Sequence, residues 1–157
     1  MDRGKKIDLV NRVLHATVNS VVQYIDIATP YVPPGYEEQR AEVQRMRDEE
    51  VRTATELTDL VNALDGTPTV GVFPYWNIDL NYLDLRFLAR FAAEHQEKAV
   101  AELEQELPKL RDDPKLHGTM ARILGEKRGH LETLREIGKP PPEPEKAEEP
   151  EAEAASE

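Results

Sequence analysis

Cysteine is absent from the 157 residues of this sequence. No segment approaches the roughly 20 consecutive apolar residues that a membrane-spanning helix needs. The lack of cysteine excludes disulfides, thiolate metal sites and thiol catalysis. The N-terminal "MDRGKK" is followed by a mixed polar pattern and not by the apolar core of a signal peptide. We therefore expect a cytoplasmic protein without a membrane segment.

Positive charge is also scarce in this chain. It has 20 lysines and arginines against 31 acidic residues, which gives a net charge of −11. Such a chain repels phosphate backbones, so nucleic acid is excluded as an expected partner. The length is sufficient for one domain with a hydrophobic core.

Hydrophobic residues recur with helical periodicity in four long segments, which predicts an all-α protein. Turn sequences separate these segments, among them Asp65-Gly66 and Asp113-Pro114, which are typical of a helix end and a helix start. The predicted helices span approximately residues 7–28, 36–64, 78–107 and 114–138.

The connection between the second and third predicted helices, "GTPTVGVFPYWN" at residues 66–77, determines the topology. Twelve extended residues reach roughly 40 Å, which is about the length of a 27-residue helix. The segment is therefore long enough to cross the whole bundle, and its aromatic part, "VFPYW", is expected to cover the helices. A four-helix bundle with one long crossover is the ferritin-like topology. We predict this bundle for residues 1–138.

Residues 139–157 form a different kind of segment, "KPPPEPEKAEEPEAEAASE", with seven acidic residues and two lysines. It contains no aromatic or large aliphatic residue, so it cannot bury enough apolar surface to offset the entropy of ordering. We predict a disordered acidic tail.

The first predicted helix carries a second apolar stripe formed by Val18, Val22 and Ile25. A helix that is apolar nearly all round is buried on more than one side. A symmetric dimer that packs this stripe is the simplest explanation. Burial beneath the extended crossover segment is the alternative.

Three stretches, "LHATVNSVVQY", "EEVRTATELTDLVNALDGTP" and "ILGEKRGHLETL", resemble bacterioferritins. The resemblance extends over roughly residues 7–137. It implies a di-iron centre for iron oxidation, built from a Glu on each of two helices and a Glu-x-x-His pair on each of the other two. It also implies a haem that a methionine ligates between subunits.

The resemblance places these six ligand positions on residues that only partly match. The residues found there are Thr17, Glu50, Thr53, Glu94, Lys127 and His130. Two glutamates and one histidine remain, and the methionine position falls on Val51. We therefore predict no haem, no catalytic residues and a degenerate di-iron site.

Lys127 stands where the resemblance implies a glutamate. A lysine ammonium has three donors and no acceptor, so it supplies the positive charge that a metal would otherwise supply. Buried carboxylates without a cation are very costly. We therefore hypothesise that Lys127 pairs with Glu50, either alone or together with Glu94, and that His130 or Thr53 completes the hydrogen bonds.

The predicted function is a non-catalytic ferritin-like scaffold or interaction protein that needs no cofactor. It would act as a homodimer or as a subunit of a larger complex, because Pro140-Pro141-Pro142 after Gly138 leaves no room for the fifth helix of cage-forming relatives. The alternative is a metal-binding protein or oxidoreductase that holds iron or manganese through Glu50, Glu94 and His130. A third possibility is co-assembly with an intact paralogue.

Overall fold

A computed structural model describes residues 1–72 and 79–140. In these two ranges the chain is helical, and its extended pairing is limited to one isolated β-bridge between Tyr31 and Asp84. The elements are α1 (Arg3–Val18), α2 (Val21–Ile25), α3 (Glu37–Ala63), α4 (Leu85–Glu106), the short 3-10 helix η2 (Leu107–Leu110) and α5 (Pro114–Gly138).

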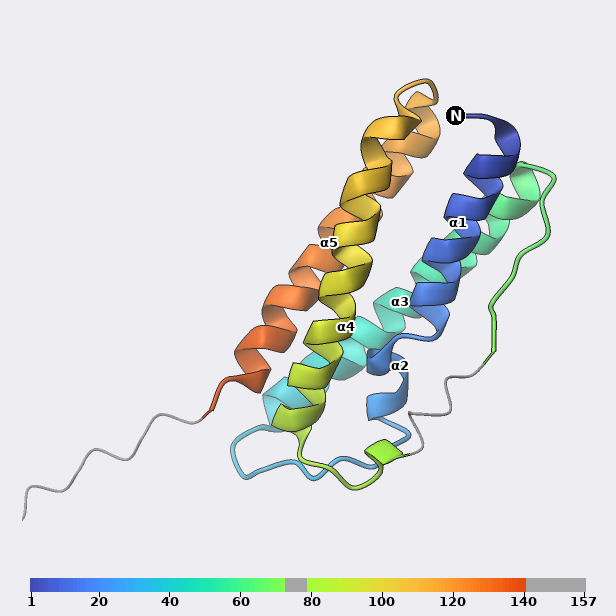
Figure 1. Cartoon of the computed structure of the whole chain (residues 1–157). Coiled ribbons are helices and arrows are strands. Elements are labelled where there is room, and N and C mark those ends of the chain that lie inside the picture. The colour runs from blue at the N-terminus through green and yellow to red at the C-terminus, as the bar shows by residue number, and fades with distance from the viewer. Residues whose placement is uncertain (73–78, 141–157) are drawn as a thin grey trace, which may run out of the picture.

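The four long helices form a bundle in which α1 packs along α3 and α4 packs along α5 (Figure 1). Helices α3 and α4 run in the same direction, and α1 and α5 run in the opposite one. Two helices that run in the same direction require a long connection. Residues 66–72 run back along the bundle from the end of α3, and residues 79–84 lie at the end where α4 begins. The predicted all-α, ferritin-like bundle with one crossover between the second and third long helices is confirmed.

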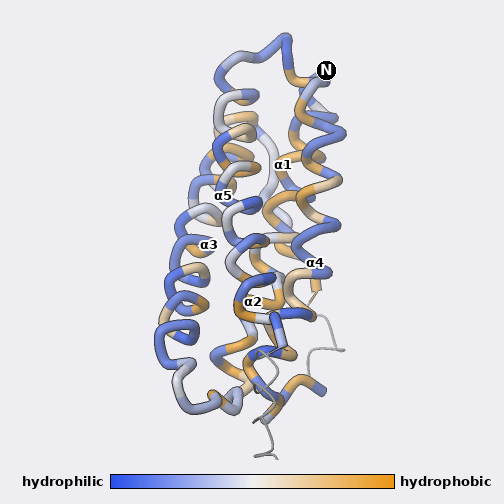
Figure 2. Tube along the Cα trace, turned by 90° about the vertical axis from the view of Figure 1, so that its left-hand side faces the viewer, coloured by the Kyte–Doolittle hydropathy of each residue, from blue (hydrophilic) through white to orange (hydrophobic). Residues whose placement is uncertain are grey.

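Hydrophobic and hydrophilic residues alternate along every long helix, as Figure 2 shows by colour. The hydrophobic residues meet in one core that extends through the bundle. Its largest fully buried members include Leu14, Met46, Leu57, Leu88 and Met120.

Aspartates begin three of the long helices. Asp2, Asp84 and Asp113 each accept a hydrogen bond from a backbone N–H in the first turn, which satisfies a donor that the helix itself leaves free. Helix α5 begins at Pro114, as predicted. Helix α4 begins at Leu85 and not near residue 78, because residues 79–84 form a turn in which Tyr82 has a positive φ of 60°.

The first predicted helix is interrupted at Asn19 and Ser20, where the chain leaves α1 and restarts as α2. The interruption rotates the following residues, so Val22 and Ile25 lie in the core with only 2% of their surface exposed. Helix α2 contacts α3 and α4 of its own chain. Burial within the bundle therefore explains Val22 and Ile25, while Val18 is only half-buried, and the dimer remains a prediction.

Residues 66–72 of the crossover are attached to α1 by asparagine side chains. Asn11 donates to the carbonyl of Thr67 at 3.0 Å and accepts from the amide of Thr69 at 2.9 Å. Asn19 donates to the carbonyl of Val70 at 2.6 Å. Gly71 has a φ of +72°, and a Cβ there would lie 2.0 Å from the His15 ring, so only glycine fits. Most of the "VFPYW" segment lies outside the described residues.

The end of α5 is fixed by α4. Arg90 donates to the carbonyl of Gly138 at 2.9 Å, and a Cβ at Gly138 would approach the Arg90 side chain to 2.6 Å. Of the tail predicted for residues 139–157, all but the first two residues lie outside the described ranges, so the tail remains a prediction.

Candidate site at the centre of the bundle

Six polar side chains lie in the interior of the bundle, each with less than 5% of its surface exposed. They come from all four long helices. They are Thr17 on α1, Glu50 and Thr53 on α3, Gln96 on α4, and Lys127 and His130 on α5. Five of these six were predicted as members of one interior group.

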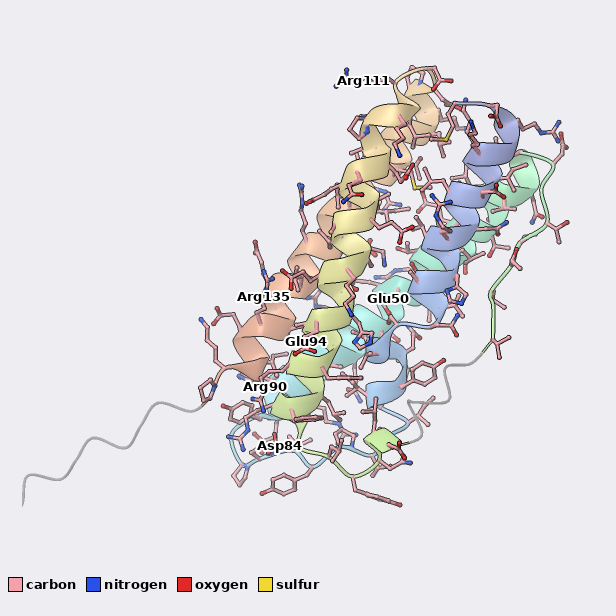
Figure 3. The ribbon with its side chains drawn as sticks, viewed as in Figure 1. Glu50, Asp84, Arg90, Glu94, Arg111 and Arg135 are labelled. Atoms are coloured by element: carbon pink, nitrogen blue, oxygen red, sulfur yellow. The ribbon has the colours of Figure 1, made fainter. Side chains whose placement is uncertain are left out.

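The sixth predicted member, Glu94, is not part of this group. Its side chain is exposed on α4, where it shares a surface depression with Arg90 and Arg135 (Figure 3). Glu94 lies seven residues after Phe87 and therefore on the same side of α4, and Phe87 is itself 44% exposed. The predicted pairing of Lys127 with Glu94 is therefore wrong, and so is a metal site that includes Glu94.

Gln96 takes the interior position on α4. The buried residues Leu88, Ala92, Gln96, Val100 and Leu103 recur at intervals of four and three, so the sequence did contain the correct register. The amide of Gln96 donates to the backbone carbonyl of Lys127 at 3.2 Å and thereby links α4 to α5. The interior side chain of α4 is therefore the uncharged Gln96, and not the predicted carboxylate of Glu94.

Glu50 accepts hydrogen bonds from residues at the interruption between α1 and α2. Its Oε2 accepts one from the Ser20 hydroxyl and one from Gln23 Nε2, the latter at 2.9 Å. Its other oxygen, Oε1, is buried and has no hydrogen-bond partner in the described part of the chain. Sequence reasoning missed Ser20 and Gln23, because they reach Glu50 only through the interruption between α1 and α2.

Lys127 is 2% exposed, and no carboxylate of residues 1–72 or 79–140 lies within salt-bridge distance of its ammonium. The predicted ion pair between Lys127 and Glu50 is therefore not formed. Burial lowers the pKa of Lys127, while the charges of Glu50 and Glu126 oppose this shift without cancelling it. The charges of Glu50 and Lys127 therefore interact electrostatically, at a distance longer than that of a hydrogen bond.

His130 and Thr53 contact glutamates at the border of the interior, which sequence reasoning also missed. His130 Nε2 donates to Glu49 Oε2 at 2.7 Å, and the Thr53 hydroxyl donates to Glu126 Oε1 at 2.7 Å. The hydrogen bond from His130, together with Arg45, lowers the pKa of Glu49. His130 Nδ1 is buried and has no partner in the described residues.

These residues do not fit a di-iron centre, which takes four carboxylates and two histidines. The buried group contains one carboxylate, Glu50, and one histidine, His130. The hydroxyls of Thr17 and Thr53 are already donating, to the Val13 carbonyl and to Glu126. Across residues 1–72 and 79–140, no three histidine, aspartate or glutamate side chains form a group that could hold a metal ion.

Val51, at the position that the resemblance assigns to a haem ligand, is 52% exposed on α3. Its side chain is a hydrocarbon without a lone pair and cannot ligate iron.

Within the described residues, no helix combines the length and the apolar composition that crossing a membrane requires.

The long crossover, the parallel α3 and α4 and the polar group inside the bundle define a ferritin-like fold. Among solved structures, the chain is similar to a bacterioferritin from Desulfovibrio desulfuricans, whose crystal structure describes its diiron site in different catalytic states. The similarity has a TM-score of 0.62 at 18% sequence identity and covers 88% of this chain and 82% of that one. At this identity it shows the fold. No family model matches the sequence, and no curated protein matches it.

Proposed function

We propose that this chain is a non-catalytic ferritin-like protein that serves as a scaffold or interaction module in the cytoplasm. The observation that supports this proposal is Lys127 in the interior of the bundle. Its charged form offers only hydrogen-bond donors, so it cannot ligate a metal, and its charge weakens the attraction of Glu50 for a cation. The degenerate site then serves to pack the four helices.

The proposed interaction surface lies at the end of the bundle where the two long loops meet. Ile27, Tyr31 and Tyr82 are 73%, 57% and 79% exposed there. The loops are held together because the amide of Tyr82 donates to the Ala28 carbonyl and that of Tyr31 donates to the Leu83 carbonyl, both at 2.9 Å. Exposed aromatic and aliphatic side chains on a fixed backbone suit a homodimer contact or a contact within a larger complex.

The acidic tail supports the same proposal. Residues 139–157 carry seven acidic residues and two lysines, which suits contact with a basic partner. Helix α5, which precedes these residues, ends at Gly138 beside Arg90, at the end of the bundle where α4 begins.

Metal analysis tests this proposal directly. The full chain is purified from cells supplemented with iron and manganese, and an intact di-iron protein of the same fold is processed in parallel. We expect far less than one metal ion per chain and no oxidation of added Fe(II). Near-stoichiometric metal in the full chain would contradict the proposal.

A second candidate function, metal binding or oxidation at an altered centre, is favoured by one observation. Glu50 Oε1 and His130 Nδ1, on two of the residues that the resemblance assigns as ligands, are both buried without a partner. Iron or manganese bound in this way should disappear in both the Glu50→Gln and the His130→Phe variants. The Glu94→Gln variant is the matched control, because the Glu94 side chain is on the surface.

A further inference from the structure

A cavity of about 360 Å³ opens between α1 and α3, on the flank that carries the crossover. Its size lies within the range of about 300–1,000 Å³ that is typical of small-molecule sites. Its apolar wall is formed by Leu14, Val18, Val51, Ala54 and Val70. Val51 and Val70 remain half-exposed at its edge. A hydrocarbon body of modest size would be well accommodated here.

Glu50 also lines this cavity, although only 1% of its surface is exposed. Ser20 and Gln23 both donate to Oε2 and hold the carboxylate in place. Oε1 is left without a donor among the described residues. A buried carboxylate oxygen without a partner is costly, so a donor that reaches it from the cavity would stabilise it.

The remaining polar groups of the cavity offer acceptors. Thr17, Thr55 and Thr58 each donate their hydroxyl hydrogen to the carbonyl four residues earlier in their own helix. Gln23 uses its amide group to donate to Glu50 and to the Arg47 carbonyl. These threonine oxygens and the Gln23 carbonyl retain lone pairs, so the cavity favours a ligand that brings its own donors.

We infer that this cavity binds a small organic ammonium ion, with the ammonium group at the Glu50 carboxylate and the apolar body against Val18, Val51 and Val70. A primary ammonium has three donors and matches a wall of acceptors. An inorganic cation would leave the apolar wall without a contact. The net charge of −11 also favours the approach of a cation. This inference does not depend on the scaffold proposal, because it concerns the outer flank of α1 and α3.

Lys127 is the cation inside the bundle that acts on Glu50, and it does so from beyond salt-bridge distance. It weakens the attraction of Glu50 for a ligand without occupying Oε1. The Lys127→Met variant should therefore bind the same organic ammonium more tightly than the parent.

Titration calorimetry on the full chain provides the test, with hexylammonium, butylammonium and hexanol as probes. Hexylammonium should bind at one site, and each methylene should raise its affinity about fourfold. Hexanol lacks the charge and should bind at least about tenfold more weakly. Equal affinity for hexanol and hexylammonium would overturn the inference. Binding of ammonium or manganese ions as tight as that of hexylammonium would also overturn it.

Two variants test whether the ligand binds in this cavity. Glu50→Gln should remove the preference for hexylammonium over hexanol. Ala54→Leu fills the cavity but keeps Glu50, and it should reduce affinity for both probes at least about tenfold. Glu38→Gln, an exposed glutamate on the same helix, is the matched control and should bind like the parent. If Ala54→Leu binds hexylammonium as the parent does, the ligand lies elsewhere and the inference fails.

Discussion

Replacing Lys127 with methionine should make the protein more stable at pH 7. Methionine is an unbranched chain of similar length and fills the same interior space. The side chain of Lys127 is 2% exposed, and no carboxylate of the described residues lies within salt-bridge distance of it. Removing a buried charge that lacks a direct partner relieves a desolvation cost. We expect a gain of about 1–2 kcal/mol in the free energy of unfolding.

The direction of the pKa shift of Lys127 gives the sign of this effect. Desolvation by burial lowers its pKa by more than the charges of Glu50 and Glu126 raise it, so folding favours the neutral amine. If Lys127 formed a direct pair with Glu50, its removal would instead cost about 3–5 kcal/mol. Glu50 keeps its two donors, Ser20 and Gln23, in the variant.

The same shift predicts a pH dependence. Between the lowered pKa of folded Lys127 and the ordinary value of 10.5, the unfolded chain binds more protons than the folded chain. The free energy of unfolding of the parent therefore rises with pH in this window. Lys127→Met lacks this contribution, so its advantage should shrink as the pH approaches 10.5.

Urea unfolding followed by far-UV circular dichroism, repeated from neutral to alkaline pH, measures both effects. A gain of 1 kcal/mol corresponds to a rise in Tm of about 2–4 °C for a chain of this size. Lys98→Met, which changes an exposed lysine on α4, is the matched control and should leave the stability almost unchanged. A fall of about 3–5 kcal/mol in the free energy of unfolding of Lys127→Met, the cost of breaking a direct pair, would refute the reasoning.

Three further predictions concern other contacts. Glu49→Gln should lower the free energy of unfolding at neutral pH, because His130 lowers the pKa of Glu49 and so stabilises the folded state. This stabilisation is lost when Glu49 is protonated, so the difference between the two proteins should vanish as the pH falls below 4.5. Acid titrations of both proteins test this. Asn11→Ala should cost about 1 kcal/mol, and hydrogen exchange at the Thr69 amide, which donates to Asn11, should become faster. Ile27→Ser should weaken self-association in sedimentation experiments while Tm stays constant, because this side chain is 73% exposed.

The sequence was sufficient to predict the bundle and the crossover. Helical periodicity, the Asp113-Pro114 start and the length of residues 66–77 are local properties that survive folding. Five interior polar positions were also predicted, because the resemblance assigned its ligand positions to Thr17, Glu50, Thr53, Lys127 and His130, and all five are buried.

The remaining parts of the site were not predicted from the sequence. On α4 the spacing of the buried residues marks Gln96 as interior, but the resemblance placed the ligand position on Glu94, two residues earlier. The contact of Glu50 with Ser20 requires an interruption of the first helix, for which the local sequence contains neither proline nor glycine. The distance between Lys127 and Glu50 is set by packing across the bundle, which a single sequence does not determine.

The interruption between α1 and α2 makes three positions depend on one another. A continuous helix would carry the Ser20 hydroxyl and the Gln23 amide away from α3, and the carboxylate at position 50 would then lose both of its hydrogen-bond donors. In sequences descended from a common ancestor with this chain, we expect positions 20, 23 and 50 to change together, with an apolar residue at 50 wherever the serine and glutamine are lost. A small irregularity in one helix would in this way dictate which residues evolution can accept in another.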